Sequence, residues 1–490
     1  MFASKLNLTV GAAASLTKSS IQLKTATRRL AGIQRMISTK PTSEGDRDVL
    51  TVNNLTGRSL VLNRPKALNS LTHPMVQSIR RHLQEWRQSD LCDIVILRSN
   101  SAKAFCAGGD VVDVSNKWTR GDRSAAMRFF QDEYQTNHLI ATYEKPLVAL
   151  LNGYTMGGGV GLSMHAPFRV ATESTVFAMP ETKIGFFPDV GATFFLPRMD
   201  GQTGTYLGLT GQRLKGRDLL YAGIATHYVP SERLPMLEKR LQEIGTRDHA
   251  VINQAIEEFS AQPEDLSEIE YSLAPLRNAI DRCFAFNNME AIVEALKQET
   301  EQPEWARQTL AVLSAVSPSS LKLTLEQLRT GRRLNIQQAF ALELRLAEHR
   351  LGSADMHEGI AALLVRKTND PQWQPSTLEA VDMRALHKEY FEGNSGSAGK
   401  TDHQQLSFIN ADAAFDQYPH AFGLPSEREI LAVVSGENPQ AGDFGMNRAQ
   451  VLQFFEREKA GKIGVGKKVA WVLDRKTREM PDSYVLECIR

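Results

Sequence analysis

The sequence predicts an α/β fold whose first half is built on a parallel sheet and whose second half is helical. Two glycine-rich turns support this prediction, KAFCAGGD at residues 103–110 and NGYTMGGGVG at residues 152–161, because each directly follows an apolar strand pattern. Repeated strand, turn and helix patterns are typical of parallel sheets, in which ligand groups lie at the carboxyl ends of the strands. From residue 231 onward, apolar residues recur mainly at helical spacing.

The first half contains a series of short elements. Alternating runs at 49–54 and 58–63 predict a β-hairpin. His73-Pro74 precedes a pattern that predicts a helix to about residue 88. The other elements of this half are expected as a strand at 93–98, a helix at 123–143, a strand from Pro146 into the second glycine turn, strands at 168–171 and 176–178, and two short helices within 203–223.

The second half is expected to be a helical region followed by a small appended unit. The run GNSGSAGKTDHQQ, which begins at residue 393, favours a linker and a boundary near residue 392. The chain is therefore divided into a sheet-containing core at 45–230, a helical region at 231–391 and a linker with the appended unit at 392–490. Helices are expected at 231–243, 248–259, 274–299, 304–316, 319–330, 335–350, 426–434 and 447–458, and a strand at 467–473.

Composition restricts the location and the partners of the protein. Residues 1–43 contain no Asp or Glu but several Lys and Arg among many Ser, Thr and Ala, which is typical of a mitochondrial transit peptide, expected at 1–40. The net charge of +1 gives no global signal for nucleic acid, so no DNA partner is expected. No window reaches the roughly 18 apolar residues of a membrane-spanning helix.

The cysteines and histidines do not predict a metal site. Their spacing matches no metal-binding pattern, and the cysteines are interpreted as reduced thiols. Cys106 lies in the first glycine turn, but no nearby histidine would activate it, so it is interpreted as a small apolar filler. His165 is interpreted as a packed or capping residue rather than a catalytic base. Neither a metal nor a cofactor is expected.

The two glycine turns are suited to holding a developing negative charge. Gly157 to Gly159 remove every Cβ at a strand-to-helix turn, so the backbone can approach a ligand and direct N–H groups at it. The first turn, with Gly108 and Gly109, has the same character. Two such turns can each supply one N–H to a single oxygen, which is the arrangement of an oxyanion hole.

The motifs FCAGGD, NGYTMGGGVG and FAMPETKIGFFPDVG, together with the helical half, resemble the crotonase (enoyl-CoA hydratase/isomerase) superfamily. The chain looks most similar to the mitochondrial 3-hydroxyisobutyryl-CoA hydrolases of valine breakdown, over roughly residues 47–391. The resemblance implies a spiral of ββα units with two sheets, C-terminal helices packed over them, and an acyl-CoA thioester as substrate. It also implies a location in the mitochondrial matrix.

The resemblance assigns the candidate site residue by residue. The oxyanion-hole donors fall on the N–H groups of Gly109 and Gly158. Hydratases of the superfamily use two carboxylates around one water, but the first of these positions is Gly161 here, as in the hydrolase subgroup, so hydration of an enoyl group is disfavoured. The second position is Glu181, and the hydrolases also use the position of Asp189.

The roles of the carboxylates are open at this point. Glu181 could attack the thioester carbon to form a mixed anhydride, or it could activate a water molecule. Asp189 could orient that water or protonate the leaving thiolate, and both carboxylates could bind the 3-hydroxyl group of the substrate. Glu133 matches a further substrate-contacting glutamate of the family. The nucleotide part of CoA is expected near Lys66, Ala67, Leu68 and Lys103, although the two lysines could equally be solvated surface charges.

Three functions are compatible with these patterns. The first is hydrolysis of 3-hydroxyisobutyryl-CoA, and of 3-hydroxypropionyl-CoA, to the free hydroxy acid and CoA. The second is a structural role in the small subunit of the mitochondrial ribosome, with which fungal relatives of this family are associated. Residues 457–478 are rich in Lys and Arg, which fits either a docking surface for RNA phosphates or the exposed face of a small appended unit. The third, an enoyl-CoA hydratase or isomerase, is disfavoured by Gly161. The acyl-chain range, which depends on loops such as 112–122, and the oligomeric state are left open.

Overall fold

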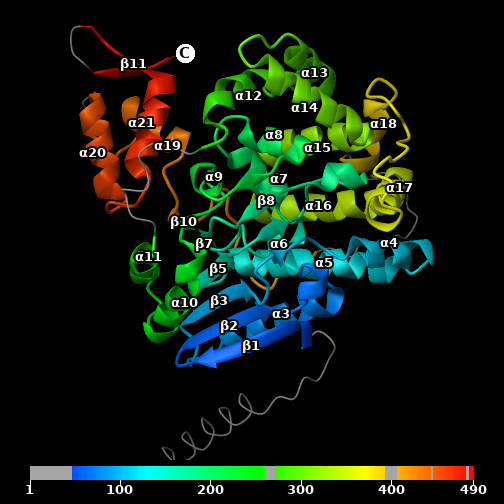
Figure 1. The fold of residues 1–490 in the computed structure, drawn as a ribbon, viewed down its shortest axis with the longest axis horizontal. Helices are drawn as coiled ribbons and strands as arrows, with labels where there is room; N and C mark the ends of the chain where they lie inside the picture. Colours follow the sequence, from blue (N-terminus) through cyan, green and yellow to red (C-terminus); the bar gives the residue numbers. More distant parts are fainter. Residues whose placement is uncertain (1–46, 261–270, 392–405, 443–444, 482–484, 490) are drawn as a thin grey trace, which may run out of the picture.

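The computed structural model describes residues 47–260, 271–391, 406–442, 445–481 and 485–489 (Figure 1). The expected transit peptide at 1–40 and the expected boundary at residue 392 lie outside these residues. The described part is a mixed α/β structure with two main sheets, many helices and a small helical unit at its C-terminal end. None of its helices combines the length and the hydropathy needed to cross a membrane.

The larger sheet has six strands in the order β1-β2-β3-β5-β7-β10. β1 and β2 form the expected antiparallel hairpin, with Val49 paired to Leu62, whereas β2, β3, β5, β7 and β10 are parallel. The residues of β2, β5 and most of β3 are buried, as expected for parallel strands covered on both faces. The strands are β1 (Val49–Asn54), β2 (Gly57–Leu62), β3 (Ile94–Ser99), β5 (Leu147–Leu151), β7 (Phe168–Ala171) and β10 (His227–Tyr228).

The smaller sheet positions the two glycine turns. Its strand order is β4 (Ala104–Cys106), β6 (Tyr154–Met156), β8 (Val176–Ala178) and β9 (Leu214–Lys215). β4, β6 and β8 are parallel neighbours, so the turns that follow them leave the sheet at the same edge. The first turn follows β4, the second follows β6, and Glu181 follows β8. Three sequence motifs therefore meet at one place.

Helices cover the sheets. α3 begins after Thr72, whose hydroxyl accepts a hydrogen bond from the Met75 N–H, and it buries the expected face that includes Ile79 and Trp86. The segment 112–122 is not a loop, since Val111–Thr119 forms α4, capped by the Asp110 carboxylate. Besides α4, the helices up to residue 257 are α3 (His73–Arg87), α5 (Arg123–Ala141), α6 (Gly158–Gly161), α7 (Ala192–Phe195), α8 (Thr203–Thr210), α9 (Asp218–Tyr221), α10 (Leu234–Glu243) and α11 (His249–Glu257).

The helical half follows the predicted pattern with two differences. The expected helix at 274–299 consists of two helices, and the helices at 354–360 and 383–390 were not predicted. A break at residues 284–288 separates α12 from α13, and Asn288 caps α13. Figure 1 shows α12, α13, α14 and α15 above the sheets, on the side away from β1. The helices are α12 (Arg277–Cys283), α13 (Met289–Lys297), α14 (Pro303–Ala315), α15 (Pro318–Gly331), α16 (Ile336–Leu351), α17 (Ala354–Ile360) and α18 (Met383–Tyr390).

The C-terminal unit contains α19 (Glu427–Val434), α20 (Arg448–Glu458), α21 (Val465–Lys476) and a small antiparallel pair, β11 (Thr477–Glu479) with β12 (Leu486–Cys488). The expected strand at 467–473 is wrong, because these residues lie in α21. Val465, Val469 and Val472 are buried at helical spacing in a small core of this unit. A short apolar run does not by itself distinguish a strand from a buried helix.

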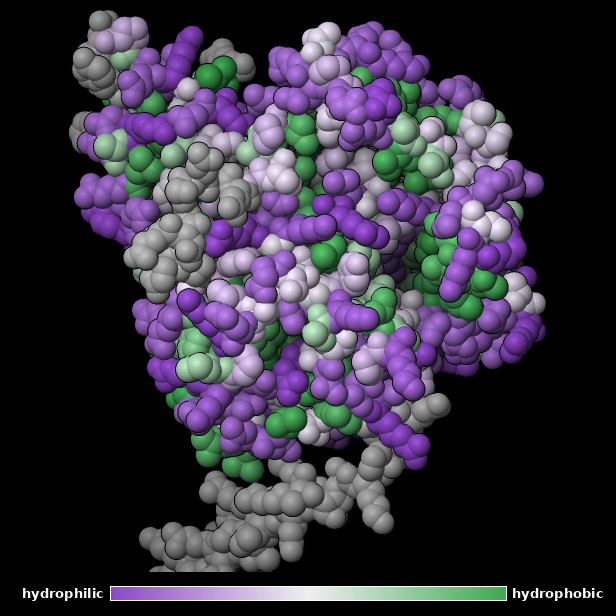
Figure 2. All heavy atoms as spheres, viewed as in Figure 1, coloured by the Kyte–Doolittle hydropathy of each residue, from purple (hydrophilic) through white to green (hydrophobic). Residues whose placement is uncertain are grey.

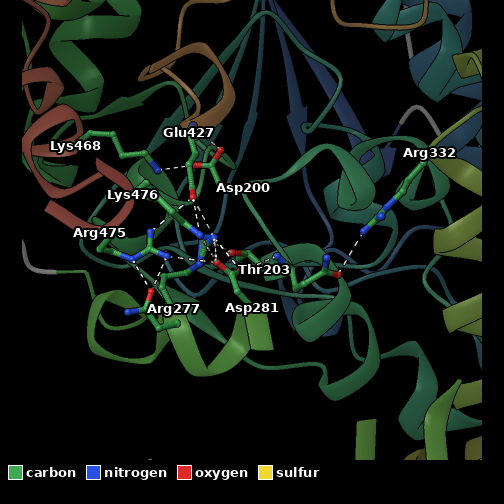
Figure 3. Close-up of polar contacts among 11 residues, drawn as sticks. Asp200, Thr203, Arg277, Asp281, Arg332, Glu427, Lys468, Arg475 and Lys476 are labelled. Atoms are coloured by element: carbon green, nitrogen blue, oxygen red, sulfur yellow. Dashed lines mark hydrogen bonds and ion pairs between the residues drawn. The ribbon is translucent and has the colours of Figure 1, made fainter. Parts of the chain in front are cut away.

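Buried ion pairs fix the C-terminal unit to the main core (Figure 3). Arg277 of α12 is 1% exposed and contacts Glu427 of α19 at 3.1 Å. Lys468 of α21 contacts Asp200 at 2.6 Å, and Arg475 of the same helix contacts Asp281 of α12 at 3.3 Å. Removing one partner from such a buried pair leaves an uncompensated charge. The unit is therefore an integral part of the described structure.

The surface is mostly hydrophilic on the face drawn in Figure 2, with apolar side chains beside a hollow on the side where α4 and α17 lie. A five-residue π-helix, Ala361–Val365, follows α17 and leaves Leu364 and Val365 exposed, at 44% and 60%. α17 itself packs against the 3₁₀ helix Glu181–Ile184, since a Cβ on Gly359 would lie 2.4 Å from the Ile184 carbonyl carbon. This side of the molecule thus adjoins the element that begins with Glu181.

Candidate active site

The two glycine turns are in direct contact. A Cβ on Gly159 would lie 2.3 Å from the Cys106 carbonyl oxygen, and one on Gly158 would lie 3.2 Å from the Gly109 nitrogen. Distances below 3.0 Å do not occur between real Cβ atoms and their neighbours, so glycine is required at Gly159. The sequence GGG after β6 therefore allows the helix α6 to start against the first turn.

The amides of Gly109 and Gly158 have no acceptor within the described residues. Around Gly109, the hydrogen bonds to Leu71 are made by the Gly108 carbonyl and the Asp110 N–H, and the Gly109 N–H makes no hydrogen bond to the described part of the chain. Gly158 is the first residue of α6, so its N–H has no intrahelical partner. The structure brings together the two donors that the sequence singled out, and both are available to an oxygen of a ligand.

Three buried carboxylates surround these turns. Glu133 of α5 directs Oε1 to Gly158, at 2.5 Å from the position of a Cβ there, and Glu181 directs Oε1 to Gly157, at 3.0 Å from the corresponding position. Glu133 Oε1 and Glu181 Oε2 have no hydrogen-bond partner among the described residues. Asp189 Oδ2 accepts a hydrogen bond of 2.8 Å from the hydroxyl of Tyr134. Glu133, Glu181 and Asp189, predicted from separate motifs, thus form one cluster.

Burial and mutual repulsion change the protonation of the cluster. Burial, and then the neighbouring Asp189 carboxylate, raises the pKa of Glu181 well above its usual range, and the same causes raise that of Glu133. Burial raises the pKa of Asp189 to about 7, although the hydrogen bond from Tyr134 opposes this shift. Adjacent buried carboxyl groups do not all ionise at neutral pH. At neutral pH the cluster can therefore hold a proton on one carboxyl group, and the raised pKa values make an ionised carboxylate in it a stronger base than an exposed one.

Gly161 has no room for a side chain. A Cβ there would lie 2.7 Å from Val190 Cβ and 2.8 Å from Asn137 Oδ1. The space that a carboxylate at this position would need is occupied by these two side chains. Position 161 therefore supplies no carboxylate to the cluster of Glu133, Glu181 and Asp189.

Sequence reasoning missed Glu343, which lies in α16 and anchors the segment after Asp189. Its carboxylate accepts hydrogen bonds from the N–H groups of Gly191 and Thr193, at 2.7 and 2.8 Å. Burial, and then Asp189, raises its pKa to about 8. The sequence contained an indication of this role, because Glu343 lies at helical spacing from Ala339 and Phe340, on the apolar face of its helix. A charged residue on a buried face indicates a specific partner.

Cys106 and His165 agree with their predicted structural interpretations. Burial raises the pKa of the Cys106 thiol to about 12, so the reactive thiolate is disfavoured at neutral pH. His165 is buried, and its two ring nitrogens face the Val190 carbonyl and the Tyr418 hydroxyl, each at 2.8 Å. Burial lowers its pKa to about 4. His165 is therefore neutral and fully engaged by protein groups.

The residues expected near the CoA nucleotide lie at the border of the first glycine turn. Lys66 and Ala67 are in a 3₁₀ helix, Pro65–Ala67, and the Leu68 carbonyl accepts a hydrogen bond from the Ala107 N–H at 3.0 Å. Lys66 and Lys103 are exposed.

A sequence profile described as enoyl-CoA hydratase/isomerase matches residues 57–391, which is more than half of the chain. The chain belongs to the enoyl-CoA hydratase/isomerase family. The crystal structure of a carnitinyl-CoA dehydratase from Mycobacterium thermoresistibile shares this fold, with a TM-score of 0.66 and 34% identity over 74% of this chain and 99% of that one. The match agrees with the two sheets and the glycine turns described above.

The relatives of this chain include CoA hydrolases and a protein of the small ribosomal subunit. The 3-hydroxyisobutyryl-CoA hydrolase, mitochondrial, of Danio rerio is 44% identical over 67% of this chain and 85% of its own length. The human protein of the same name is 41% identical over 68% of this chain and 85% of its own length. The small ribosomal subunit protein mS47 of Neurospora crassa is 42% identical over 91% of this chain and 90% of its own length.

Proposed function

We propose that this family member hydrolyses the thioester of a 3-hydroxyacyl-CoA, with 3-hydroxyisobutyryl-CoA as its main substrate and 3-hydroxypropionyl-CoA as a second one. The observation that carries the proposal is the pair of amides at Gly109 and Gly158, which have no acceptor among the described residues and lie beside the carboxylate of Glu181. A thioester oxygen bound by both amides is polarised toward an oxyanion, and one such donor contributes about 2.7 to 4 kcal/mol in other enzymes. The names of the hydrolase relatives support the choice of substrate.

Glu181 performs the central step by one of two routes. In the first, its carboxylate oxygen attacks the thioester carbon, the C–S bond breaks, and water then cleaves the resulting mixed anhydride to release the hydroxy acid. In the second, Glu181 removes a proton from water, and the hydroxide adds to the same carbon before the C–S bond breaks. In both routes the CoA thiolate leaves and takes up one proton. No metal or cofactor takes part in this proposal.

Asp189 and Glu133 complete the site. Asp189, with a pKa of about 7, is suited either to orient the water or to supply the proton to the leaving thiolate. Glu133, whose Oε1 has no partner among the described residues, is suited to accept a hydrogen bond from the 3-hydroxyl group. A plain acyl group would leave that buried oxygen unpaired, and such a mismatch discriminates strongly between substrates.

The absence of a side chain at Gly161 argues against hydration of an enoyl group. That reaction needs a second carboxylate at the water, and Val190 and Asn137 occupy the space. The proposed site therefore has one attacking or activating carboxylate, Glu181, and an oxyanion hole. This combination fits acyl transfer to water.

Release of free CoA thiol from purified residues 40–490 tests the proposal. The substrates are 3-hydroxyisobutyryl-CoA and 3-hydroxypropionyl-CoA, with isobutyryl-CoA as the matched control that lacks the hydroxyl group. We expect fast release from the first two and slow release from the third. Equal release from all three would contradict the role of the hydroxyl group, and no release from any of them would contradict the hydrolase.

A second function, in the small subunit of the mitochondrial ribosome, is supported by one specific observation. The similarity to the Neurospora crassa ribosomal protein spans 91% of this chain, whereas hydrolase relatives from Danio rerio and Xenopus tropicalis span 67% and 79%. The C-terminal unit lies beyond residue 391, where the family profile ends. It would supply the docking surface, and both functions can coexist in one chain.

Sedimentation of a mitochondrial extract tests the ribosomal role. We expect co-migration with the small subunit at low salt and release at high salt, because contacts to RNA phosphates weaken as salt rises. Free protein at every salt concentration would contradict this role.

We further propose the mitochondrial matrix as the location, on the basis of the composition of residues 1–43 and the names of the hydrolase relatives.

A further inference from the structure

We propose that Tyr418 is a positioning residue for Asp189, and that it acts through His165 and the carbonyl group of Val190. Tyr418 lies between the family-matched region, which ends at residue 391, and the C-terminal unit. The inference rests on the proposed function in so far as Asp189 takes part in hydrolysis. Its structural half, the ordering of the turn 189–191, is independent of that function.

The turn that carries Asp189 has a backbone conformation that its surroundings must maintain. Val190 has a φ of 54°, in the left-handed region that β-branched residues rarely adopt. A residue in such a conformation is strained and persists only where neighbouring contacts determine it. The missing side chain of Gly161 leaves the space that Val190 fills.

His165 supplies one of these contacts. Its Nε2 lies 2.8 Å from the Val190 carbonyl oxygen, which can only accept, so Nε2 carries the proton. The neutral ring then has an unprotonated Nδ1, which accepts a hydrogen bond of 2.8 Å from the Tyr418 hydroxyl. With the hydroxyl in place, both ring nitrogens are satisfied in the tautomer that holds Val190.

The other side of the turn is held by Glu343. Its carboxylate accepts hydrogen bonds from the Gly191 and Thr193 N–H groups, while His165 binds the Val190 carbonyl group. The imidazole lies directly against Gly191, where a Cβ would be 2.4 Å from His165 Nε2. Two buried side chains thus fix the backbone on both sides, and Asp189 stays within 2.8 Å of the Tyr134 hydroxyl.

The ring of Tyr418 is fixed independently of its hydroxyl group. It lies edge-on to Phe194, with ring centroids 5.1 Å apart, and it contacts Phe415 at 5.8 Å. The same segment is attached to α5 at another place, where Asn410 Nδ2 donates to the Thr142 carbonyl at 3.1 Å. The removal of the hydroxyl group alone therefore leaves the segment in place and isolates its effect on His165.

The test compares Tyr418→Phe with Asn410→Ala in the full chain. For Tyr418→Phe we expect kcat for 3-hydroxyisobutyryl-CoA to fall about 5- to 50-fold, with KM within about twofold, because a small displacement of a reacting group lowers the rate more than binding. Asn410→Ala weakens the attachment of the same segment but leaves His165 untouched, so we expect wild-type kcat. Equal kcat in Tyr418→Phe and wild type would overturn the proposal, as would an equal loss in Asn410→Ala.

Two variants of His165 test the relay itself. His165→Gln keeps a side-chain N–H that can reach the Val190 carbonyl, whereas His165→Leu does not. We expect the glutamine variant to retain most of the activity and the leucine variant to lose more than Tyr418→Phe does. Equal losses in both variants would overturn the assignment of the Val190 carbonyl as the point of action.

Hydrogen–deuterium exchange separates this proposal from the hydrolase proposal. The Gly191 and Thr193 N–H groups are protected by Glu343 only while the turn keeps its conformation. We expect faster exchange of the peptide that contains them in Tyr418→Phe and unchanged exchange in Asn410→Ala. If the wild-type protein releases no CoA, the proposed function fails while this result still decides the positioning role. Unchanged exchange in Tyr418→Phe would overturn that role.

Discussion

The hydroxyl group of Tyr134 donates a hydrogen bond of 2.8 Å to Asp189 Oδ2, and both residues are buried. The two groups come from α5 and from the turn after Pro188, so the contact joins two separate parts of the site. The bond stabilises the ionised form of Asp189 against the effect of burial. The loss of this bond would therefore raise the pH at which Asp189 changes its charge.

Tyr134→Phe should raise the pKa of Asp189 above its value of about 7, because the only change is the loss of this hydrogen bond. A hydrogen bond to a charged group contributes about 1.5 to 3 kcal/mol, so we expect an upward shift of about one to two units. The pH profile of kcat/KM measures it, and the limb that disappears in Asp189→Asn belongs to Asp189. An unchanged position of that limb in Tyr134→Phe would contradict the assignment.

The pH dependence of stability gives a second prediction. Because the pKa of Asp189 is raised from 3.8 to about 7, the folded state holds a proton that the unfolded state has lost between these values. The contribution of the Asp189 carboxyl group to the free energy of unfolding is fully present below pH 3.8 and is lost as the pH rises through 7. Between these values it falls by about 1.4 kcal/mol per pH unit.

Asp189→Asn removes this titration and keeps an acceptor for Tyr134. We expect the variant to gain stability relative to wild type from pH 4.5 to 6.5, at the slope given above. Urea unfolding at several pH values measures the difference in the free energy of unfolding. A difference that stays constant across this pH range would show that the carboxyl group is not protonated in the folded state.

Glu181→Gln should lower kcat for thioester hydrolysis by at least about 100-fold, since an amide can neither attack the thioester carbon nor remove a proton from water. The wild-type rate should rise with pH beyond the usual range of a carboxyl group, because burial raises the pKa of Glu181. Thiol release measures both effects. Turnover at the wild-type rate in this variant would refute the proposed mechanism.

Gly161→Ala should destabilise the fold by about 1 to 3 kcal/mol, because its Cβ would overlap with Val190 Cβ and Asn137. It should also disturb the Asp189 turn and lower kcat. Gly352→Ala is the matched control, since a Cβ there has its nearest neighbour at 3.4 Å and the glycine has a φ of −85°. We expect thermal unfolding to separate the two variants by several degrees, and equal melting temperatures would contradict the packing argument.

Lys468→Met should destabilise the protein by about 3 kcal/mol, because it leaves Asp200 buried without its cation. Burial alone would raise the pKa of Asp200, but the Lys468 ammonium group holds it below its usual value. Arg448→Ala is the control, since its pair with Asp474 is exposed and such pairs contribute less than about 1 kcal/mol. Similar denaturant midpoints in the two variants would argue against a structural role for the buried ions.

The elements near the site could be predicted from sequence because their signals are local. A glycine run after an apolar strand predicts a turn that approaches its neighbours closely, and the structure places Gly109, Gly158, Glu181 and Asp189 together. The helix α4 and the helical nature of residues 467–473 were missed. Both segments are short and apolar on one side, and such segments take their structure from the surfaces against which they pack.

The sequence by itself therefore determined the family resemblance, the parallel sheets and the glycine turns that meet beside Glu181. Only the tertiary structure decided the protonation of those residues and the groups that hold them. Tyr134, Glu343, His165 and Tyr418 come from four separate segments and meet at one buried turn. Burial and hydrogen bonds between distant segments have no local pattern in the chain, because they arise only when the core closes.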